Sequence, residues 1–168
     1  MMLFIDTEWA DTLANDLVSL ALVSDCGRLE FYAERDPLPA SATDFVRSVV
    51  YPRLDRGERA LPDPQFTLQL HEFIGAAQQA ARPERLTIAY DHRNDLDLLG
   101  IALEAFDAPE TPPRPAFQLQ DLSQLGRAYA QQIEAVFASD LTLRSRRHHA
   151  LVDARVNRDA YLQLHPQR

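Results

Sequence analysis

The sequence contains no lysine, and its 17 basic residues, all arginine, stand against 25 acidic ones, for a formal net charge of −8. This balance argues against binding nucleic acid through a broad basic surface, which normally needs an excess of positive charge. Cysteine is nearly absent as well, since Cys26 is the single example. One thiol excludes an internal disulfide and a thiolate-rich zinc site, and we interpret Cys26 as a small buried hydrophobe.

Long apolar runs are also missing. No stretch approaches the roughly 20 apolar residues of a membrane span, and the apolar start Leu3-Phe4-Ile5 has no basic leader and is interrupted by Asp6. We therefore expect no signal peptide, no membrane partner and a cytoplasmic location. A length of 168 residues with 46% hydrophobic content predicts a single domain over residues 1–168.

Apolar patterning predicts the order of secondary structure. Strands are expected at residues 3–9, 17–24 and 28–34, as an antiparallel meander with a turn at 25–27. Ser41 or Thr43 is expected to cap a helix over residues 45–50, which Pro52 should end. We then expect a loop at 55–65, a helix carrying apolar residues 68–77, a strand at 85–89, a helix to about 106, a surface loop at 107–116, a strand at 117–120, and helices at 122–136 and 150–164. The predicted class is α/β, with a ribonuclease-H-like mixed central sheet, in which an antiparallel meander of three strands is joined by parallel strands, flanked by helices.

Two acids stand on the first predicted strand. Asp6 and Glu8 are two residues apart, so both side chains leave the same face of the sheet. The preceding residues 3–5 are continuously apolar and indicate a central buried strand, where unpaired carboxylates are costly and two like charges need a cation. The alternative is an ordinary exposed acidic pair, since a chain this acidic contains several such spacings by chance.

The last predicted helix carries an acid in its apolar stripe. Asp153 shares a face with Ala150, Ala154, Ala160, Tyr161 and Leu164. His148 lies just before the helix and could overhang a site that Asp153 helps to build. The alternatives are a rim acid hydrogen-bonded to Asn157 and an ordinary histidine, like its neighbour His149.

The helix after the fourth predicted strand repeats this pattern. Asp91 and Asp95 both fall on its apolar face, and one of them is expected to be a metal ligand. Asp91 could instead be a simple N-terminal cap. Asp97 faces the opposite, polar side.

Together these residues form an Asp-x-Glu strand, an Asp at a helix start and a His-x4-Asp segment, and this pattern resembles the DEDDh 3′-to-5′ exonuclease superfamily over nearly the whole chain. Residues 4–8 are similar to its first motif and residues 148–154 to its third. Within the superfamily, three features resemble the RNase AS-like bacterial exoribonucleases: the aromatic Trp9 after Asp6-Thr7-Glu8, the run at residues 46–54, and Ala89-Tyr90-Asp91-His92.

The resemblance implies a catalytic set made up of His148, Asp6, Glu8, Asp91 and Asp153. In it the four acids hold two divalent cations, Mg²⁺ or Mn²⁺, and His148 is the general base. The implied activity is hydrolysis of single-stranded RNA from its 3′ end to nucleoside 5′-monophosphates, with adenylate as the preferred base, by a homodimer. Many members place Asn four residues before the second-motif Asp, and the pair Asp91 and Asp95 mimics that spacing. Asp95 therefore stays an alternative ligand, although the Tyr-Asp-His match favours Asp91.

Two substrate contacts are hypothesised. Trp9 could stack on an unpaired base, or it could be a core aromatic at a strand end. Arg147 belongs to a cluster that could bind phosphate or form a solvated helix edge. Its members are Arg144, Arg146, Arg147, Arg155 and Arg158.

The rival functions are a DNA exonuclease of the proofreading type, a non-catalytic nucleic-acid-binding module on the same fold, and an unrelated acidic metal-binding protein. The last would be expected to show calcium loops, and the sequence contains none.

Overall fold

The computed structural model describes residues 1–107 and 113–166, and within them the chain forms a six-stranded mixed sheet in the order β4-β3-β2-β1-β5-β6. Its strands are β1 (Met2–Trp9), β2 (Leu17–Ser24), β3 (Glu30–Arg35), β4 (Ala60–Leu61), β5 (Thr87–Tyr90) and β6 (Gln118–Asp121). Strands β1 to β3 form the predicted antiparallel meander, while β5 runs parallel to β1 and β6 parallel to β5. The predicted mixed sheet is confirmed. Strand β4, parallel to β3, was not predicted, because two residues carry no detectable periodicity.

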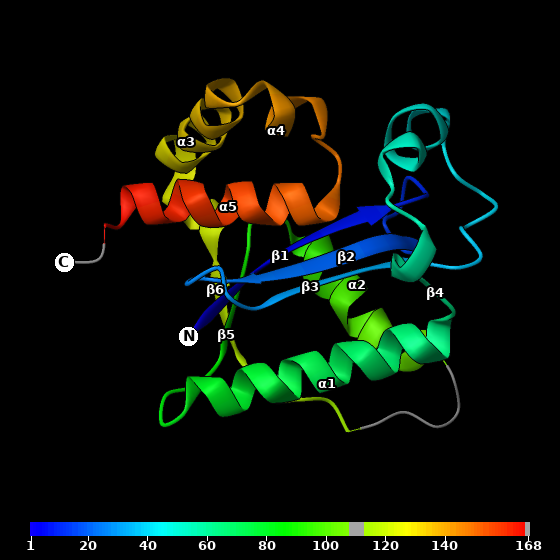
Figure 1. The fold of residues 1–168 in the computed structure, drawn as a ribbon, viewed down its shortest axis with the longest axis horizontal. Coiled ribbons are helices and arrows are strands. Elements are labelled where there is room, and N and C mark those ends of the chain that lie inside the picture. Colours follow the sequence, from blue (N-terminus) through cyan, green and yellow to red (C-terminus); the bar gives the residue numbers. More distant parts are fainter. Residues whose placement is uncertain (108–112, 167–168) are drawn as a thin grey trace.

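Helices cover both faces of this sheet (Figure 1). They are α1 (Asp63–Ala81), α2 (Arg93–Leu103), α3 (Gly126–Ser139), α4 (Leu141–Ser145) and α5 (Ala150–Leu164). Leu3 and Ile5 of β1 pack into a core with α1 and α2, whereas Phe4 packs with α3 and α5. Alternate β1 side chains thus enter two different cores, which explains the continuous apolar run of this central strand.

The segment between β3 and β4 differs from the prediction. Residues Val46–Val50 form a π-helical turn and Tyr51–Arg53 a 3-10 turn. Pro52 therefore lies inside the 3-10 turn instead of ending a helix, at a first-turn position where no backbone N–H is needed. The Thr43 hydroxyl accepts a hydrogen bond from the Val46 N–H at 3.3 Å, so Thr43 is the cap of the two proposed.

Other predicted boundaries shifted for local reasons. The helix predicted at 122–136 is divided into the 3-10 turn Leu122–Leu125 and α3 by Gly126, whose φ of 64° lies in the left-handed region. The helix predicted to reach about 106 ends at Leu103, and Phe106 has a φ of 53°. Cys26, predicted to be buried, is exposed in the turn between β2 and β3. Residues 108–112 of the predicted loop at 107–116 lie outside the described residues.

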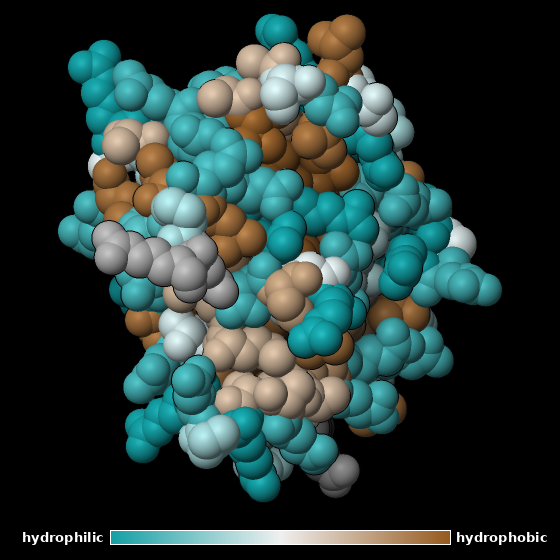
Figure 2. Space-filling model, turned by 60° about the vertical axis from the view of Figure 1, so that its left-hand side comes forward, coloured by the Kyte–Doolittle hydropathy of each residue, from teal (hydrophilic) through white to brown (hydrophobic). Residues whose placement is uncertain are grey.

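The surface is largely hydrophilic on the face drawn in Figure 2, where apolar side chains form separate patches among polar ones. Among the helices of the described residues, none combines the length and the apolar character needed to cross a membrane.

Candidate active site

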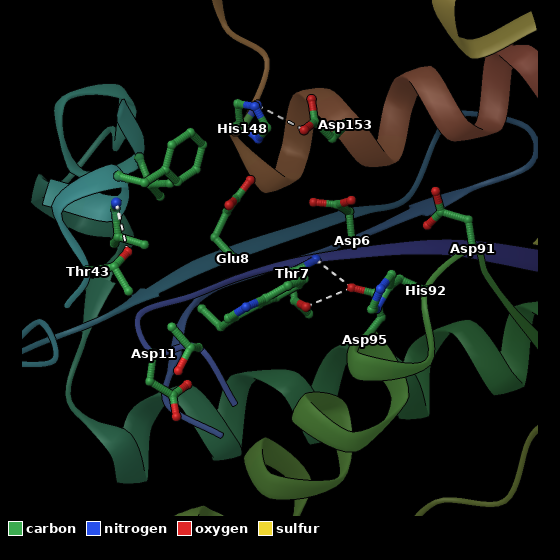
Figure 3. Close-up of a pocket in the computed structure, with 15 residues that line it drawn as sticks. Asp6, Thr7, Glu8, Asp11, Thr43, Asp91, His92, Asp95, His148 and Asp153 are labelled. Carbon is green, nitrogen blue, oxygen red and sulfur yellow. Dashed lines mark hydrogen bonds between the residues drawn. The ribbon is translucent and has the colours of Figure 1, made fainter. Parts of the chain in front are cut away.

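The acids of β1 point toward helix α5. Asp6 and Glu8 continue the row of Phe4, whose side chain packs with α5, so strand alternation directs all three to this face. Figure 3 shows Asp6 and Glu8 pointing from the strand toward Asp153 and His148 at the start of α5. Glu8, His148 and Asp153 each offer one potential ligand atom, and these atoms lie within 4.8 Å of one another. The structure therefore brings Glu8 together with residues that follow it by 140 and 145 positions.

Asp91 lies on the same side of the sheet. The parallel register pairs Phe4 with Ala89, and Asp6 and Asp91 each follow two residues later, Asp91 just beyond the end of β5. Asp91 is close enough for its charge to raise the pKa of Asp6. The Oδ1 atom of Asp91 accepts a hydrogen bond from the Asn157 side chain of α5 at 3.3 Å. The N-terminal cap of α2 is His92, whose Nδ1 accepts a hydrogen bond from the Asn94 N–H. Asp91 is therefore not the helix cap, the alternative that the sequence had left open.

Asp95 lies beneath β1, on the side of α2 (Figure 3). Its Oδ1 atom accepts hydrogen bonds from the Thr7 N–H at 3.1 Å and the Thr7 hydroxyl at 2.7 Å. Thr7 belongs to the opposite face of β1 from Asp6 and Glu8. Asp95 is thus tied to the strand's other face, and this placement favours Asp91 as the ligand while leaving Asp95 near enough to raise the pKa of Asp6.

His148 has an unusual backbone next to these acids. Its φ of 68° lies in the left-handed region, and its N–H donates to the Asp153 Oδ2 at 2.9 Å. Its ring meets the Phe45 ring edge to face, with 5.2 Å between centroids. The pKa of His148 is lowered, first by burial and then by the charges of Arg147 and Arg53. The neutral imidazole, the form that can accept a proton, is therefore favoured.

The acids strongly resist ionisation in this setting. Burial is the largest cause that raises the pKa of Glu8 to about 8 and the pKa of Asp153 to about 7. The pKa of Asp6 is raised well above its ordinary value by burial and then by neighbouring acids, beginning with Asp153. Burial also raises the pKa of Asp91. Grouped carboxylates removed from water in this way require positive charge to be ionised together near neutral pH.

This donor set fits hard divalent cations. Mg²⁺ and Mn²⁺ prefer carboxylate oxygens, and the cluster supplies them from Asp6, Glu8, Asp91 and Asp153. The Oδ1 atom of Asp153 is buried without a hydrogen-bond partner among the described residues, as expected for an atom meant to meet a ligand. Asn157, proposed as an alternative partner of Asp153, bonds Asp91 instead.

A groove passes over the acids. A hollow of about 440 Å³ on one side has Trp9, Phe45, Val46 and His92 among its walls. A second hollow of about 290 Å³ on the other side has walls that include Ile133, Phe137 and Arg147. Both are bordered by Asp6, Asp91, His148 and Asp153. The acid cluster therefore lies where the two hollows meet.

Two aromatic residues border the first hollow. Trp9 is half-buried, and its ring lies 5.7 Å from that of His92, so it is partly a strand-end core residue and partly a wall of the groove. Phe45 is 51% exposed beside His148. The sequence placed Phe45 among the apolar residues of the helix expected at 45–50, and no local pattern distinguishes it from the buried Val46.

The predicted arginine cluster is mostly paired with acids. Arg147 contacts Glu134 at 2.7 Å and lies over the Phe137 ring at 4.8 Å. Close acidic contacts are also made by Arg146 with Asp55, Arg155 with Glu30, and Arg158 with Asp159. This pairing favours the interpretation of most of these arginines as solvated surface residues and not as phosphate ligands. Arg147 is the member of the cluster that borders the groove.

Arg53 is a charged neighbour of the cluster that sequence reasoning did not single out. It lowers the pKa of Glu8, Asp153 and His148, so its guanidinium acts on all three. The run at residues 46–54 contains it, but no spacing marked it as a site residue.

No family model matches this chain, and no curated protein matches it. The convergence and burial of the acids therefore carry the functional interpretation.

Proposed function

We propose that this protein is a metal-dependent 3′-to-5′ exonuclease that acts on RNA and has a ribonuclease-H-like fold. The observation that carries the proposal is the convergence of Asp6, Glu8, Asp91 and Asp153 beside His148 on one face of the sheet. These residues come from β1, the end of β5 and the start of α5, and burial alone would make such a group of acids unfavourable. The mixed six-stranded sheet flanked by helices is compatible with that fold.

The four acids would hold two divalent cations, which when bound supply Lewis-acid stabilisation of negative charge on phosphate oxygens and lower the pKa of water. His148 would remove a proton from the attacking water, and its lowered pKa suits a general base near neutral pH. The bond from Asp153 to the His148 N–H fixes the backbone that carries this base. Phe45 packs edge to face against the His148 ring and would help to orient it.

The groove supports an unpaired strand as the substrate. Trp9 and Phe45 offer aromatic surface in the first hollow, where a base released from stacking can be held. Arg147 borders the second hollow, where a phosphate of the neighbouring nucleotide would lie, although its pairing with Glu134 reduces its free charge. RNA is preferred to DNA in this proposal because of the resemblance of residues 6–9, 46–54 and 89–92 to bacterial exoribonucleases.

The test uses RNA and DNA oligomers of each base, labelled at the 3′ or the 5′ end and incubated with or without Mn²⁺. Stepwise loss from the 3′ end of RNA, dependent on Mn²⁺ and absent in Asp6→Ala, is the expected result. The Asp6→Ala protein, purified identically, excludes a contaminating nuclease. Shortening of DNA alone would select a DNA exonuclease, and shortening of no substrate would reject both.

A further inference from the structure

The backbone of His148 adopts an uncommon conformation. A φ of 68° is unfavourable for most residues other than glycine, and although histidine adopts it more often than most, contacts with the surroundings stabilise it. The bond from its N–H to Asp153 fixes one side of the residue. The contacts that fix the chain immediately before and after His148 must supply the rest.

The chain before His148 is held by residues 53–55. The Arg146 Nη2 atom donates to the Asp55 Oδ1 at 2.6 Å and lies 3.5 Å from the Arg53 carbonyl. The Arg53 Nε atom donates in turn to the Ser145 carbonyl at 3.3 Å. Residues 53–55 and 145–146 thus form a reciprocal set of contacts across more than 90 positions of sequence.

The residue after His148 lies against the same aspartate. His149 is fully buried, and its ring is stacked on Tyr32 with 4.6 Å between centroids. Its Nε2 lies 3.4 Å from the Asp55 Oδ2, a close contact that is not a hydrogen bond. Asp55 is itself anchored, because its N–H donates to the Oε1 of the buried Glu34 at 2.7 Å. One carboxylate therefore contacts both Arg146 and His149, on either side of the 147–148 segment.

We propose that Asp55 is a positioning residue that, through Arg146 and His149, holds His148 in its left-handed conformation beside Glu8 and Asp153. Asp55 does not border either hollow over the acids, so it acts through its neighbours and not by touching substrate. An isolated, partly exposed ion pair contributes little. Here the carboxylate links two contacts and a buried anchor, so its loss frees the segment on both sides of His148.

The test compares Asp55→Ala and Arg146→Gln with Glu30→Gln. The anchoring N–H of residue 55 belongs to the backbone and persists in Asp55→Ala. Glu30 is a matched control because it forms a similar ion pair, with Arg155 of α5 at 2.6 Å, but does not contact the segment before His148. Two quantities are measured: the exchange rate of the His148 amide hydrogen by NMR, which reports local opening, and kcat and KM on RNA.

In both test variants we expect the His148 amide to exchange about tenfold faster or more, with Glu30→Gln unchanged. We expect kcat to fall by about ten- to a hundredfold while KM stays within about twofold, because the base is displaced and the substrate groove is not. The double variant should be little worse than either single one, since both remove the same contact.

Wild-type exchange at His148 in Asp55→Ala and in Arg146→Gln would overturn the proposal, as would a rise in KM at constant kcat. The rate prediction rests on the proposed nuclease activity, whereas the exchange prediction does not. A wild-type protein that degrades no nucleic acid would therefore remove the proposed function, while the exchange rates would still decide the role of Asp55.

Discussion

Replacement of Asp153 with asparagine is expected to stabilise the cation-free protein at pH 8 while abolishing nuclease activity. Asparagine has nearly the same shape, and its side-chain oxygen can still accept from the His148 N–H, whose bond to Asp153 is 2.9 Å. It removes a carboxylate whose pKa burial raises from 3.8 to about 7. The substitution therefore separates the charge of residue 153 from its packing.

The size and the pH range of the effect follow from that pKa. Below pH 3.8 the carboxyl is protonated in both the folded and the unfolded chain, so it has no net effect. As pH rises, the unfolded chain ionises first, and the folded state becomes progressively less stable until pH reaches about 7. At about 1.4 kcal/mol per pKa unit the full penalty is on the order of 4 kcal/mol. Allowing for the cost of burying the new amide, we expect Asp153→Asn to gain about 2 to 4 kcal/mol, or roughly 5 to 15 °C in Tm.

The assay is thermal unfolding followed by circular dichroism at pH 4 and pH 8, with a chelator or with Mn²⁺. The gain should be present at pH 8 in chelator and nearly absent at pH 4. Mn²⁺ should stabilise the wild type by mass action and Asp153→Asn much less. Asp97→Asn is the control, because Asp97 is exposed and its weak pair with Arg93 at 3.6 Å predicts a change within about 0.5 kcal/mol. Equal Tm values at pH 8 in chelator, or equal stabilisation of wild type and Asp153→Asn by Mn²⁺, would refute the reasoning.

Four further variants test individual residues. Asp91→Asn should weaken Mn²⁺ binding, measured by calorimetry, more than Asp95→Asn does, because Asp95 is bound to Thr7; the reverse order would make Asp95 the ligand. His148→Gln should lower kcat by about 10²- to 10⁴-fold with Mn²⁺ affinity retained, and retained kcat would remove its role as the base. Trp9→Ala should raise the KM for RNA by roughly fivefold or more if a base stacks on it, whereas an unchanged KM would leave Trp9 a core residue.

The sequence by itself determined the strand and helix patterns that place most of the acids. A two-residue period puts Asp6 and Glu8 on one face of β1, and the continuous apolar run of residues 3–5 shows that this strand is covered on both sides. The 3.6-residue period of α5 puts Asp153 in the stripe that packs on the sheet. These inferences succeed because the information is local and repeats along one element.

Tertiary structure alone decided what depends on contacts between distant segments. Both Asp91 and Asp95 suit an apolar helix face, and only the sheet register and the bonds to Asn157 and Thr7 separate them. The left-handed backbone of His148 likewise could not be predicted locally, since most histidines have negative φ and only a minority adopt positive values. Its neighbours Arg146 and His149 contact Asp55, more than 90 positions away, and a pattern along one element cannot contain such contacts.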